Sequence, residues 1–329
     1  MNRIAQKTGV GSRLIRWCIQ FAGQIAFLLI LFAVLSVASP TFRTTGNLIN
    51  VARQVSVNMI VACAMTMVLI IGGIDLSVGS VMAMSGMVSS YLSLSGFPFA
   101  VCLLAGLAAG ALSGFVDGII LANADMPPFI VTYAMQSILR GMVYVITGAG
   151  TIRLTSTAYL AFGGSSLGPI PLPVIYMAVI IILSILLLSH SKLGRHMYAI
   201  GGNPRAAQFA GIDTKQIKVL IYTLSGACAA MAGMVLTSRN SSMQPGVGSG
   251  AEMDAIAAVV LGGTSMAGGR GSISGTILGA FIIGFINNGL NMLRMDSFYQ
   301  YIAKGIVILI AVYMDYVKNQ RLLKGSNAA

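Results

Sequence analysis

The stretch PFAVCLLAGLAAGALSGFVDGIILA, residues 98–122, combines a continuous apolar run with a regular series of glycines. It is long enough to cross a bilayer as one helix, which takes about 20 apolar residues. The glycines recur every four residues and therefore share one helix face: Gly106, Gly110, Gly114 and Gly118. Such a flat stripe lets a second helix approach closely, and a shorter version begins at Gly275 and Gly279. We favour internal helix packing over a dimer interface as the use of this stripe.

The whole chain has the composition of a polytopic membrane protein. Of its 329 residues, 56% are hydrophobic and only 9% are charged, with a mean hydropathy of +0.86, whereas soluble domains carry about 25% charged residues. The formal net charge is +12, but no basic run with interleaved aromatic residues is present, so we expect no nucleic-acid partner. The positive charges lie between apolar stretches, where they set membrane topology.

Apolar stretches recur along the chain and predict an all-α, polytopic helical bundle of about ten transmembrane helices. We place the spans near 20–38, 53–71, 77–95, 98–122, 127–147, 171–189, 215–236, 252–266, 272–291 and 299–317. The eighth is short and a glycine-rich turn joins it to the ninth, so the count is approximate. Together they form a single transmembrane domain over 1–329.

The distribution of Lys and Arg predicts the orientation. With the N-terminus inside, thirteen Lys and Arg fall in cytoplasmic segments and five in outside segments, which favours both termini in the cytoplasm. The cytoplasmic parts are then 1–19, a loop at 190–214 and a tail at 318–329. The largest outside loop, about 148–170, holds no second domain.

The cytoplasmic loop contains SKLGRHMYAIGGNPRAAQFAGID, Ser191–Asp213, which carries start and stop signals for a short helix. Asn203 can cap this helix, Pro204 suits its first position, and Gly211 supplies a left-handed stop. About seven helical residues, or roughly 10 Å of rod, result. Two uses stay open: docking against a soluble partner, and a solvated connector with basic topology residues.

Two glycine-containing motifs lie at predicted helix junctions. In GGIDLSVGS, Gly72–Ser80, we favour a helix-capping role for Asp75 over a role in a gate or proton path, because the residue stands where a turn is needed. GGTSMAGGRGSISG, Gly262–Gly275, is either a hinge near the transport path or a tight cytoplasmic turn. Neither is a nucleotide-binding loop, because no G-x-x-x-x-G-K-[ST] pattern occurs.

Polar residues inside the predicted spans form three stripes at helical spacing. The first holds Thr132, Gln136 and Arg140, the second Asn287, Asn291 and Arg294, and the third Gln54 and Asn58. Amide and guanidinium groups suit the hydroxyls of a neutral, polyhydroxylated solute. Interhelical hydrogen bonding is the favoured role for any single residue, but three stripes together favour a polar translocation path. Its candidate residues are Asn58, Asp75, Thr132, Gln136, Arg140, Asn287 and Asn291.

Three motifs resemble those of one transporter family over about 27–317. They are GGIDLSVGS (72–80), GRHMYAIGGNPRAAQFAGI (194–212) and AIAAVVLGGTSMAGGRGSISGTILGAFIIGFINNGLN (255–291). In this order they resemble the permease subunits of bacterial ABC importers for monosaccharides, the ribose-type branch. The resemblance implies that the loop around Asn203–Ile212 is the coupling helix that docks into an ATPase. The matching coupling residues are Gly194, Arg195, Gly201, Gly202, Asn203, Ala206, Ala207, Gly211 and Ile212.

The resemblance also implies the partners. A periplasmic sugar-binding protein delivers the solute, and a cytoplasmic ABC ATPase subunit holds ATP and Mg²⁺, so this chain binds no cofactor itself and is not an enzyme. A second permease copy completes the channel in the bacterial inner membrane, as a homodimer or a heterodimer. A ribose-like pentose or related sugar is the expected solute, and the identity of the sugar is left open.

Two other classes were weighed against this interpretation. An ion-coupled secondary sugar carrier needs an ionisable residue in mid-membrane. The acidic candidates are Asp75, Asp117, Asp125, Glu252, Asp254 and Asp296, and most of these six fall near predicted span ends. An intramembrane serine protease lacks a membrane histidine, because His190 and His196 lie at or beyond the cytoplasmic edge. No cluster has metal-ligand spacing, so we expect no metal site.

Overall fold

The computed structural model describes residues 21–295 together with Tyr299, Ile302, Gly305, Ile306, Leu309 and Tyr313. The segments 1–19 and 318–329 and most of the expected span 299–317 lie outside these residues. The regular structure of the described part is almost all helix, as the apolar composition predicts, so the all-α membrane bundle is confirmed.

The elements have the following bounds. The helices are α2 Ala22–Ala38, α3 Thr45–Ile70, α4 Val78–Leu94, α5 Phe99–Asn123, α6 Pro128–Thr147, α7 Thr157–Gly164, α8 Leu172–His190, α9 Lys192–Gly202, α10 Pro204–Phe209, α11 Thr214–Arg239, α12 Ala251–Leu261 and α13 Ile273–Met292, with a 3-10 turn η1 at Pro40–Arg43. The strands are β1 Ile152–Arg153, β2 Ser166–Leu167, β3 Ile170–Pro171 and β4 Ser242–Met243. Antiparallel pairs join β1 to β4 and β2 to β3.

Six helices of the described part are long and apolar enough to cross a membrane: α3, α5, α6, α8, α11 and α13. Helices α2 and α4 are shorter apolar helices. The expected span 252–266 is wrong as a full crossing, because α12 has only 11 residues, or about 16 Å of helix. A bilayer core is about 30 Å thick, so α12 covers about half of it.

Helix α3 forms the centre of the bundle. Every side chain from Met59 to Ile70 is buried, and α8, α11, α12 and α13 all pack against this helix. Helix α5, by contrast, lies at the periphery and exposes Leu104, Leu112 and Phe115. These apolar side chains face outward, as expected for a surface in contact with lipid.

The glycine stripe of α5 packs against α11 within the same chain. A Cβ added at Gly110 or Gly114 would collide with the backbone of Gly226 or Tyr222, and one added at Gly118 would collide with the backbone of Val219. The two backbones therefore touch directly along the α5–α11 contact. Internal packing, the favoured interpretation of this stripe, is confirmed.

Helices α4 and α12 both begin inside the bundle. Asp75, just before α4, accepts a hydrogen bond from Ser225 of α11, and Ser225 lies about 16 Å from the start of that helix, close to its middle. Gly79, in the first turn of α4, lies against Gly248 and Glu252 at the start of α12. Asp75 is 1% exposed, so the chain turns into the interior of the bundle before α4 starts.

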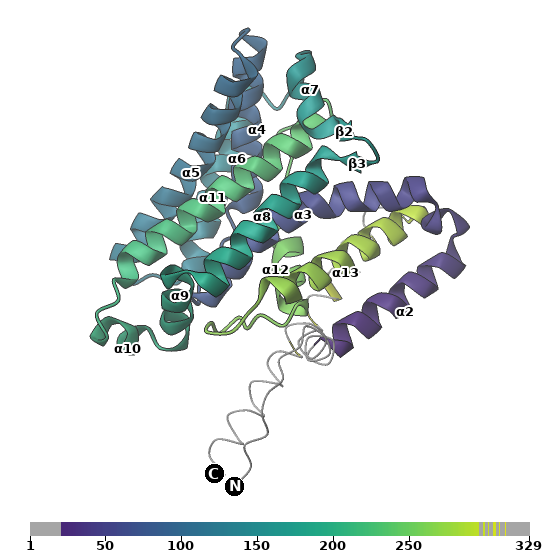
Figure 1. Cartoon of the computed structure of the whole chain (residues 1–329). Coiled ribbons are helices and arrows are strands. Elements are labelled where there is room, and N and C mark those ends of the chain that lie inside the picture. The colour runs from purple at the N-terminus through teal and green to yellow at the C-terminus, as the bar shows by residue number, and fades with distance from the viewer. Residues whose placement is uncertain are drawn as a thin grey trace.

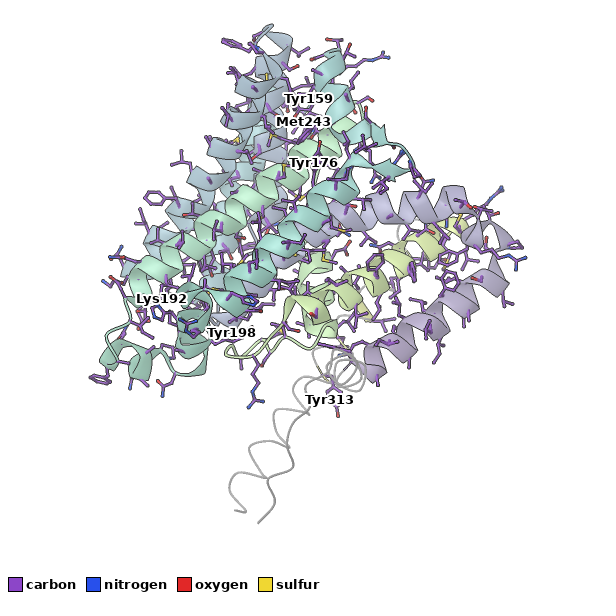
Figure 2. All side chains as sticks on the ribbon, viewed as in Figure 1. Tyr159, Tyr176, Lys192, Tyr198, Met243 and Tyr313 are labelled. Carbon is purple, nitrogen blue, oxygen red and sulfur yellow. The ribbon has the colours of Figure 1, made fainter. Side chains whose placement is uncertain are left out.

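The two ends of the bundle carry different elements. Figure 1 shows α9 and α10 at one end, and α7 with the β2–β3 hairpin at the opposite end. The side chains labelled in Figure 2 mark the same ends, with Lys192 and Tyr198 on α9, and Tyr159 and Met243 near α7. In the predicted topology the α9–α10 end is cytoplasmic.

We expect Gly114→Ala to destabilise the protein, because its new methyl group would meet the Tyr222 carbonyl of α11. Overpacking of a close contact costs about 1–3 kcal/mol, and thermal or denaturant unfolding in detergent measures it. Gly141→Ala on α6 is the matched control, since nothing lies within 4 Å of the new methyl group. Equal stability of the two variants would contradict the role given to the α5–α11 contact.

Candidate functional site: the coupling loop and the polar interior

The short helix α10 has the caps that its sequence predicts. The Asn203 side chain accepts a hydrogen bond from the Ala206 N–H at 3.0 Å, Pro204 occupies the first turn, and Gly211 has a φ of +81°. The helix has six residues rather than about seven. Its surface is exposed except for Ala207, and the Phe209 side chain is 92% exposed. An apolar ring this exposed beside a basic residue, Arg205, can serve as a docking group.

The sequence analysis missed helix α9. Ser191 lies between α8 and α9 in an extended conformation. It caps α9 by accepting a hydrogen bond from the Gly194 N–H at 3.0 Å. Gly194 is buried where a Cβ would collide with the Leu187 and Leu188 carbonyls. A serine three residues before a glycine, as at Ser191 and Gly194, is the sequence signal for the start of this second helix.

Glycine contacts hold α9 against the rest of the protein. Gly201 lies against the Ile70 carbonyl at the end of α3, and against the Gly269 N–H, which donates to that same carbonyl at 2.9 Å. Gly202 lies against Gly269 as well. The Tyr198 hydroxyl donates to the Gly271 carbonyl at 2.8 Å. The loop 262–272, called here the glycine-rich loop, is thus packed directly against α9.

The predicted coupling residues divide between surface and interior. Arg195, Gly202, Asn203, Ala206 and Gly211 are exposed, Gly201 and Ile212 are half-buried, and Gly194 and Ala207 are buried. The exposed set can face another protein. The buried residues instead anchor α9 and α10 to their own chain.

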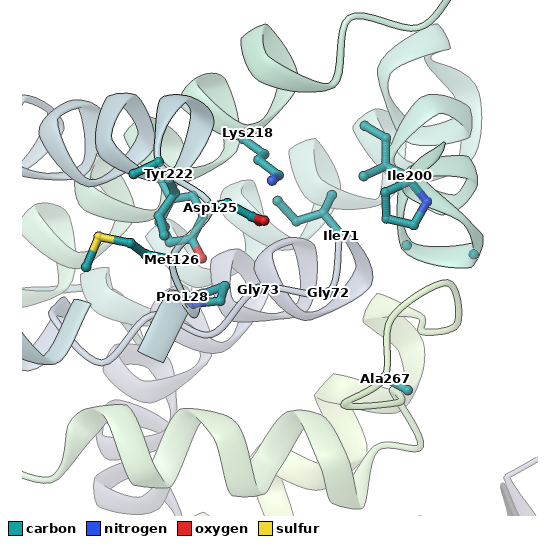
Figure 3. Close-up of a pocket in the computed structure, with 15 residues that line it drawn as sticks. Ile71, Gly72, Gly73, Asp125, Met126, Pro128, Ile200, Lys218, Tyr222 and Ala267 are labelled. Atoms are coloured by element: carbon teal, nitrogen blue, oxygen red, sulfur yellow. The ribbon is translucent and has the colours of Figure 1, made fainter. Parts of the chain in front are cut away.

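The segment 190–214, which holds α9 and α10, is called here the coupling loop. A pocket of about 400 Å³ opens beside it. Its walls come from the segments that follow α3 and α5, from the end of α9 and from α11, and include Gly73, Asp125, Lys218 and Tyr222. Figure 3 shows the Tyr222 ring reaching from α11 toward Gly73, with Lys218 and Asp125 nearby. The Tyr222 side chain therefore lines this pocket and also contacts the Ile74 carbonyl, directly before Asp75.

Asp75 is buried and fully hydrogen-bonded in the interior. One carboxylate oxygen accepts from the Ser77 N–H at 2.9 Å and the Ser77 hydroxyl at 2.7 Å, and the other accepts from the Ser225 hydroxyl at 2.6 Å. The bond to the Ser77 N–H lies in the turn before α4, whose N-cap residue is Ser77, and no side chain makes a capping bond to this helix, so the predicted cap at Asp75 is not formed. Its bond to Ser225 ties the re-entering segment to α11. A role in a gate or proton path stays a prediction.

The polar stripe of α6, formed by Thr132, Gln136 and Arg140, faces the segments that lead into α4 and α12. Thr132 donates to the Ile74 carbonyl at 3.2 Å and Gln136 to Glu252 at 3.4 Å. Arg140 donates to the carbonyls of Pro245 and Val247 at 2.6 and 2.8 Å; these precede α12. The three residues share one face, as their spacing predicts. Thr132 and Arg140 bond to the segments that precede α4 and α12, and Gln136 bonds to the first turn of α12.

The other predicted path residues are not brought together with this group. Asn287 is buried and donates to Asp254 of α12 at 3.1 Å, whereas Asn291 is exposed one turn later. Asn58 is half-buried on α3. The sequence analysis missed one pair of buried amide side chains: Asn47 and Asn288 each donate a hydrogen bond to the other, at 2.9 and 3.0 Å.

Acidic side chains lie at both internal helix starts. Glu252 and Asp254 are buried in the first turn of α12, and Asp75 immediately precedes α4. The partial positive charge of a helix N-terminus stabilises carboxylates at these places. These three residues lie at or next to helix starts, near the predicted span ends, but they are buried because α4 and α12 start within the bundle. No group of three or more metal-ligating side chains occurs within the described residues.

Comparison with known proteins gives a family match over most of the chain. Residues 47–312 match the family described as branched-chain amino acid transport system / permease component. No solved structure matches the chain.

Several characterised relatives align over nearly their full length. The chain is 44% identical over 307 residues to the ribose import permease protein RbsC of Escherichia coli (strain K12), covering 92% of this chain and 95% of that protein. It is 37% identical over 295 residues to the D-allose transport system permease protein AlsC of the same strain, covering 89% and 90%. It is 34% identical over 301 residues to the L-arabinose ABC transporter permease protein AraH of Azospirillum brasilense, covering 91% and 89%.

We expect Arg140→Met to lower the stability of the protein, because methionine matches the length of the arginine stem but donates no hydrogen bond. The Pro245 and Val247 carbonyls would lose their partner, at about 1–3 kcal/mol for each buried group left unpaired. Thermal unfolding and protease cleavage within 240–250 measure the effect. The control is Arg43→Met at an exposed position of η1, and indistinguishable melting of both variants would argue against the Arg140 contact.

Proposed function

This chain belongs to the family of transport-system permease components that residues 47–312 match, and we propose that it is the membrane-spanning permease subunit of an ABC importer for a ribose-like monosaccharide. The observation that carries the proposal is α10, an exposed and capped helix that packs against α9, which glycine contacts hold on the bundle. A chain without a nucleotide-binding loop needs such a surface to receive work from a separate ATPase.

The relatives support a sugar as the solute. The family description mentions amino acids, whereas near full-length relatives are named for ribose, D-allose and L-arabinose. We therefore infer a monosaccharide, with ribose as the first choice because that relative is the most similar of the three. The polar side chains of α6 and α12 supply amide, guanidinium and carboxylate groups that suit sugar hydroxyls, once helix movement opens them.

The partner ATPase is proposed to bind the coupling loop at α10. Phe209, Arg205 and Ala206 face outward and would enter the ATPase surface. ATP and Mg²⁺ would be held by that partner alone, and this chain would carry no cofactor. ATP can drive transport only if it binds the two conformations of the complex with different affinity.

The contacts within the chain offer a route from α10 to the interior. Movement of α10 would displace α9, whose Gly201 and Tyr198 contact the end of α3 and the glycine-rich loop. That loop joins α12 to α13. A shift of α12 would in turn change the Gln136–Glu252 contact and the Arg140 contacts just before α12.

The remaining partners and the topology follow the same proposal. A periplasmic sugar-binding protein would dock at the α7 end, and a second permease copy, identical or a sibling, would complete the path in the inner membrane. The chain is proposed as one permease domain with both termini cytoplasmic. We propose about ten membrane segments: the six long helices, α2 and α4, the partial crossing by α12, and a last segment over 299–317.

Reconstitution in vesicles with the cognate ATPase and binding protein tests the proposed function. We expect uptake of labelled ribose, or of another monosaccharide from a panel, only when ATP is enclosed with the ATPase. Uptake driven by a proton or sodium gradient with this chain alone would overturn the proposal.

We expect Ala206→Trp to block ATPase binding without affecting folding, because Ala206 is exposed on α10. Stimulated ATP hydrolysis and sugar uptake should both fall at least about tenfold, which corresponds to about 1.4 kcal/mol of lost docking free energy. Ala207→Trp provides the contrast, because Ala207 is 4% exposed and its replacement should unfold the loop itself. Normal ATPase binding by the Ala206→Trp protein, measured by co-purification, would remove the docking role of α10.

A further inference from the structure

Two buried carboxyl groups lie close together in the interior of the bundle. Asp117 of α5 is 0% exposed and Asp75 is 1% exposed. Asp75 accepts a hydrogen bond from Ser225 of α11, and Gly114, one turn before Asp117, lies against Tyr222 and Gly226 on the same stretch of α11. We call Asp75 and Asp117 the acid pair.

The two members of the acid pair have opposite hydrogen-bonding environments. Asp75 receives three hydrogen bonds from Ser77 and Ser225, and such donors stabilise an ionised carboxylate. Neither oxygen of Asp117 has a hydrogen-bond partner within the described residues. The Ser77 hydroxyl also lies near Asp117, but its single proton is donated to Asp75.

The close α5–α11 contact keeps Asp117 in a dry environment. Gly114 and Gly118, which flank Asp117 along α5, lie against the backbones of Tyr222 and Val219. An isolated ionised carboxylate in such surroundings is costly, and it takes up a proton instead. A second negative charge beside it raises the cost further. No Lys or Arg side chain is among the groups that act on Asp75 or Asp117 in the described part of the chain.

We propose that Asp117 binds one proton in the folded protein, next to an ionised Asp75, and that the acid pair is a proton-binding site reached from the pocket beside the coupling loop. A proton fits better than a metal ion. A metal ion would need several oxygen ligands, and both oxygens of Asp75 are already occupied by serine donors.

The pocket supplies the route for exchange of this proton. Tyr222 and Leu121 line its inner wall, and Leu121 lies one helical turn beyond Asp117. The Tyr222 hydroxyl donates to the Ile74 carbonyl at 3.4 Å, directly before Asp75. Two other titratable groups, Asp125 and Lys218, also line the pocket, and neither belongs to the acid pair.

Unfolding at different pH values, together with infrared spectroscopy, tests the site on the purified full-length chain in lipid nanodiscs. A proton held by the folded chain and released on unfolding makes the folded state less stable as the pH rises. We expect the folding equilibrium constant of the native chain to fall by up to about tenfold per pH unit where one proton is released. Asp117→Asn, a neutral mimic of the protonated acid, should remove this dependence. Asp125→Asn, at the exposed pocket residue, should keep it.

The infrared spectrum gives a readout that does not depend on the variants being stable. The native chain should show the carbonyl stretch of a protonated carboxyl group at neutral pH, and Asp117→Asn should lack it. The same pH dependence in the native and Asp117→Asn proteins, or no protonated carboxyl band in the native chain, would overturn the proposal. Stabilisation by sodium relative to choline that Asp117→Asn abolishes would also overturn it, in favour of a metal cation.

Discussion

The direct contact between the backbones of α5 and α11 is the constraint on which the rest of the structure depends. Four glycines on α5 make it possible, because any larger side chain would strike the α11 main chain or side chains such as Met234 and Ala230. In a bilayer, where helices gain little from hydrophobic association, such close packing supplies the van der Waals energy that holds them together. The contact also closes the interior around Asp117, which is 0% exposed between Gly114 and Gly118.

A rigid α5–α11 pair allows other segments to cross the membrane incompletely. The chain before α4 and the chain before α12 both enter the bundle in non-helical form, which is tolerated at membrane depth only when protein covers the backbone. Arg140 and Thr132 of α6 supply that cover by donating to carbonyls of these segments. The main role of the polar stripe of α6 is therefore to hydrogen-bond the non-helical backbone before α4 and α12. Any contact with a solute requires these bonds to exchange partners.

In α9 and in and after α10, small residues have two different roles that the sequence pattern does not distinguish. Gly194 and Gly201 bring α9 against the ends of α8 and α3, whereas Ala206 and Gly211 leave α10 open on the surface. The first group transmits displacement within the chain and the second can meet a partner. Phe209, which no glycine or alanine pattern indicates, is the largest exposed side chain on α10.

The class of protein, most of the helix positions and the caps of α10 could be predicted from the sequence, because each depends on local chemistry: apolar length, a capping side chain, a proline or a glycine. The glycine stripe likewise predicted a close helix contact. Its partner, the existence of α9, the depth at which α4 and α12 begin, and the burial of Asp75 and Asp117 required the tertiary structure. These features arise where segments far apart in the chain meet, as Asp75 meets Ser225 and Gly201 meets Gly269. Hydropathy along a sequence measures how well a segment suits lipid, but not which other segment shields it, and that shielding is what decided the interior of this protein.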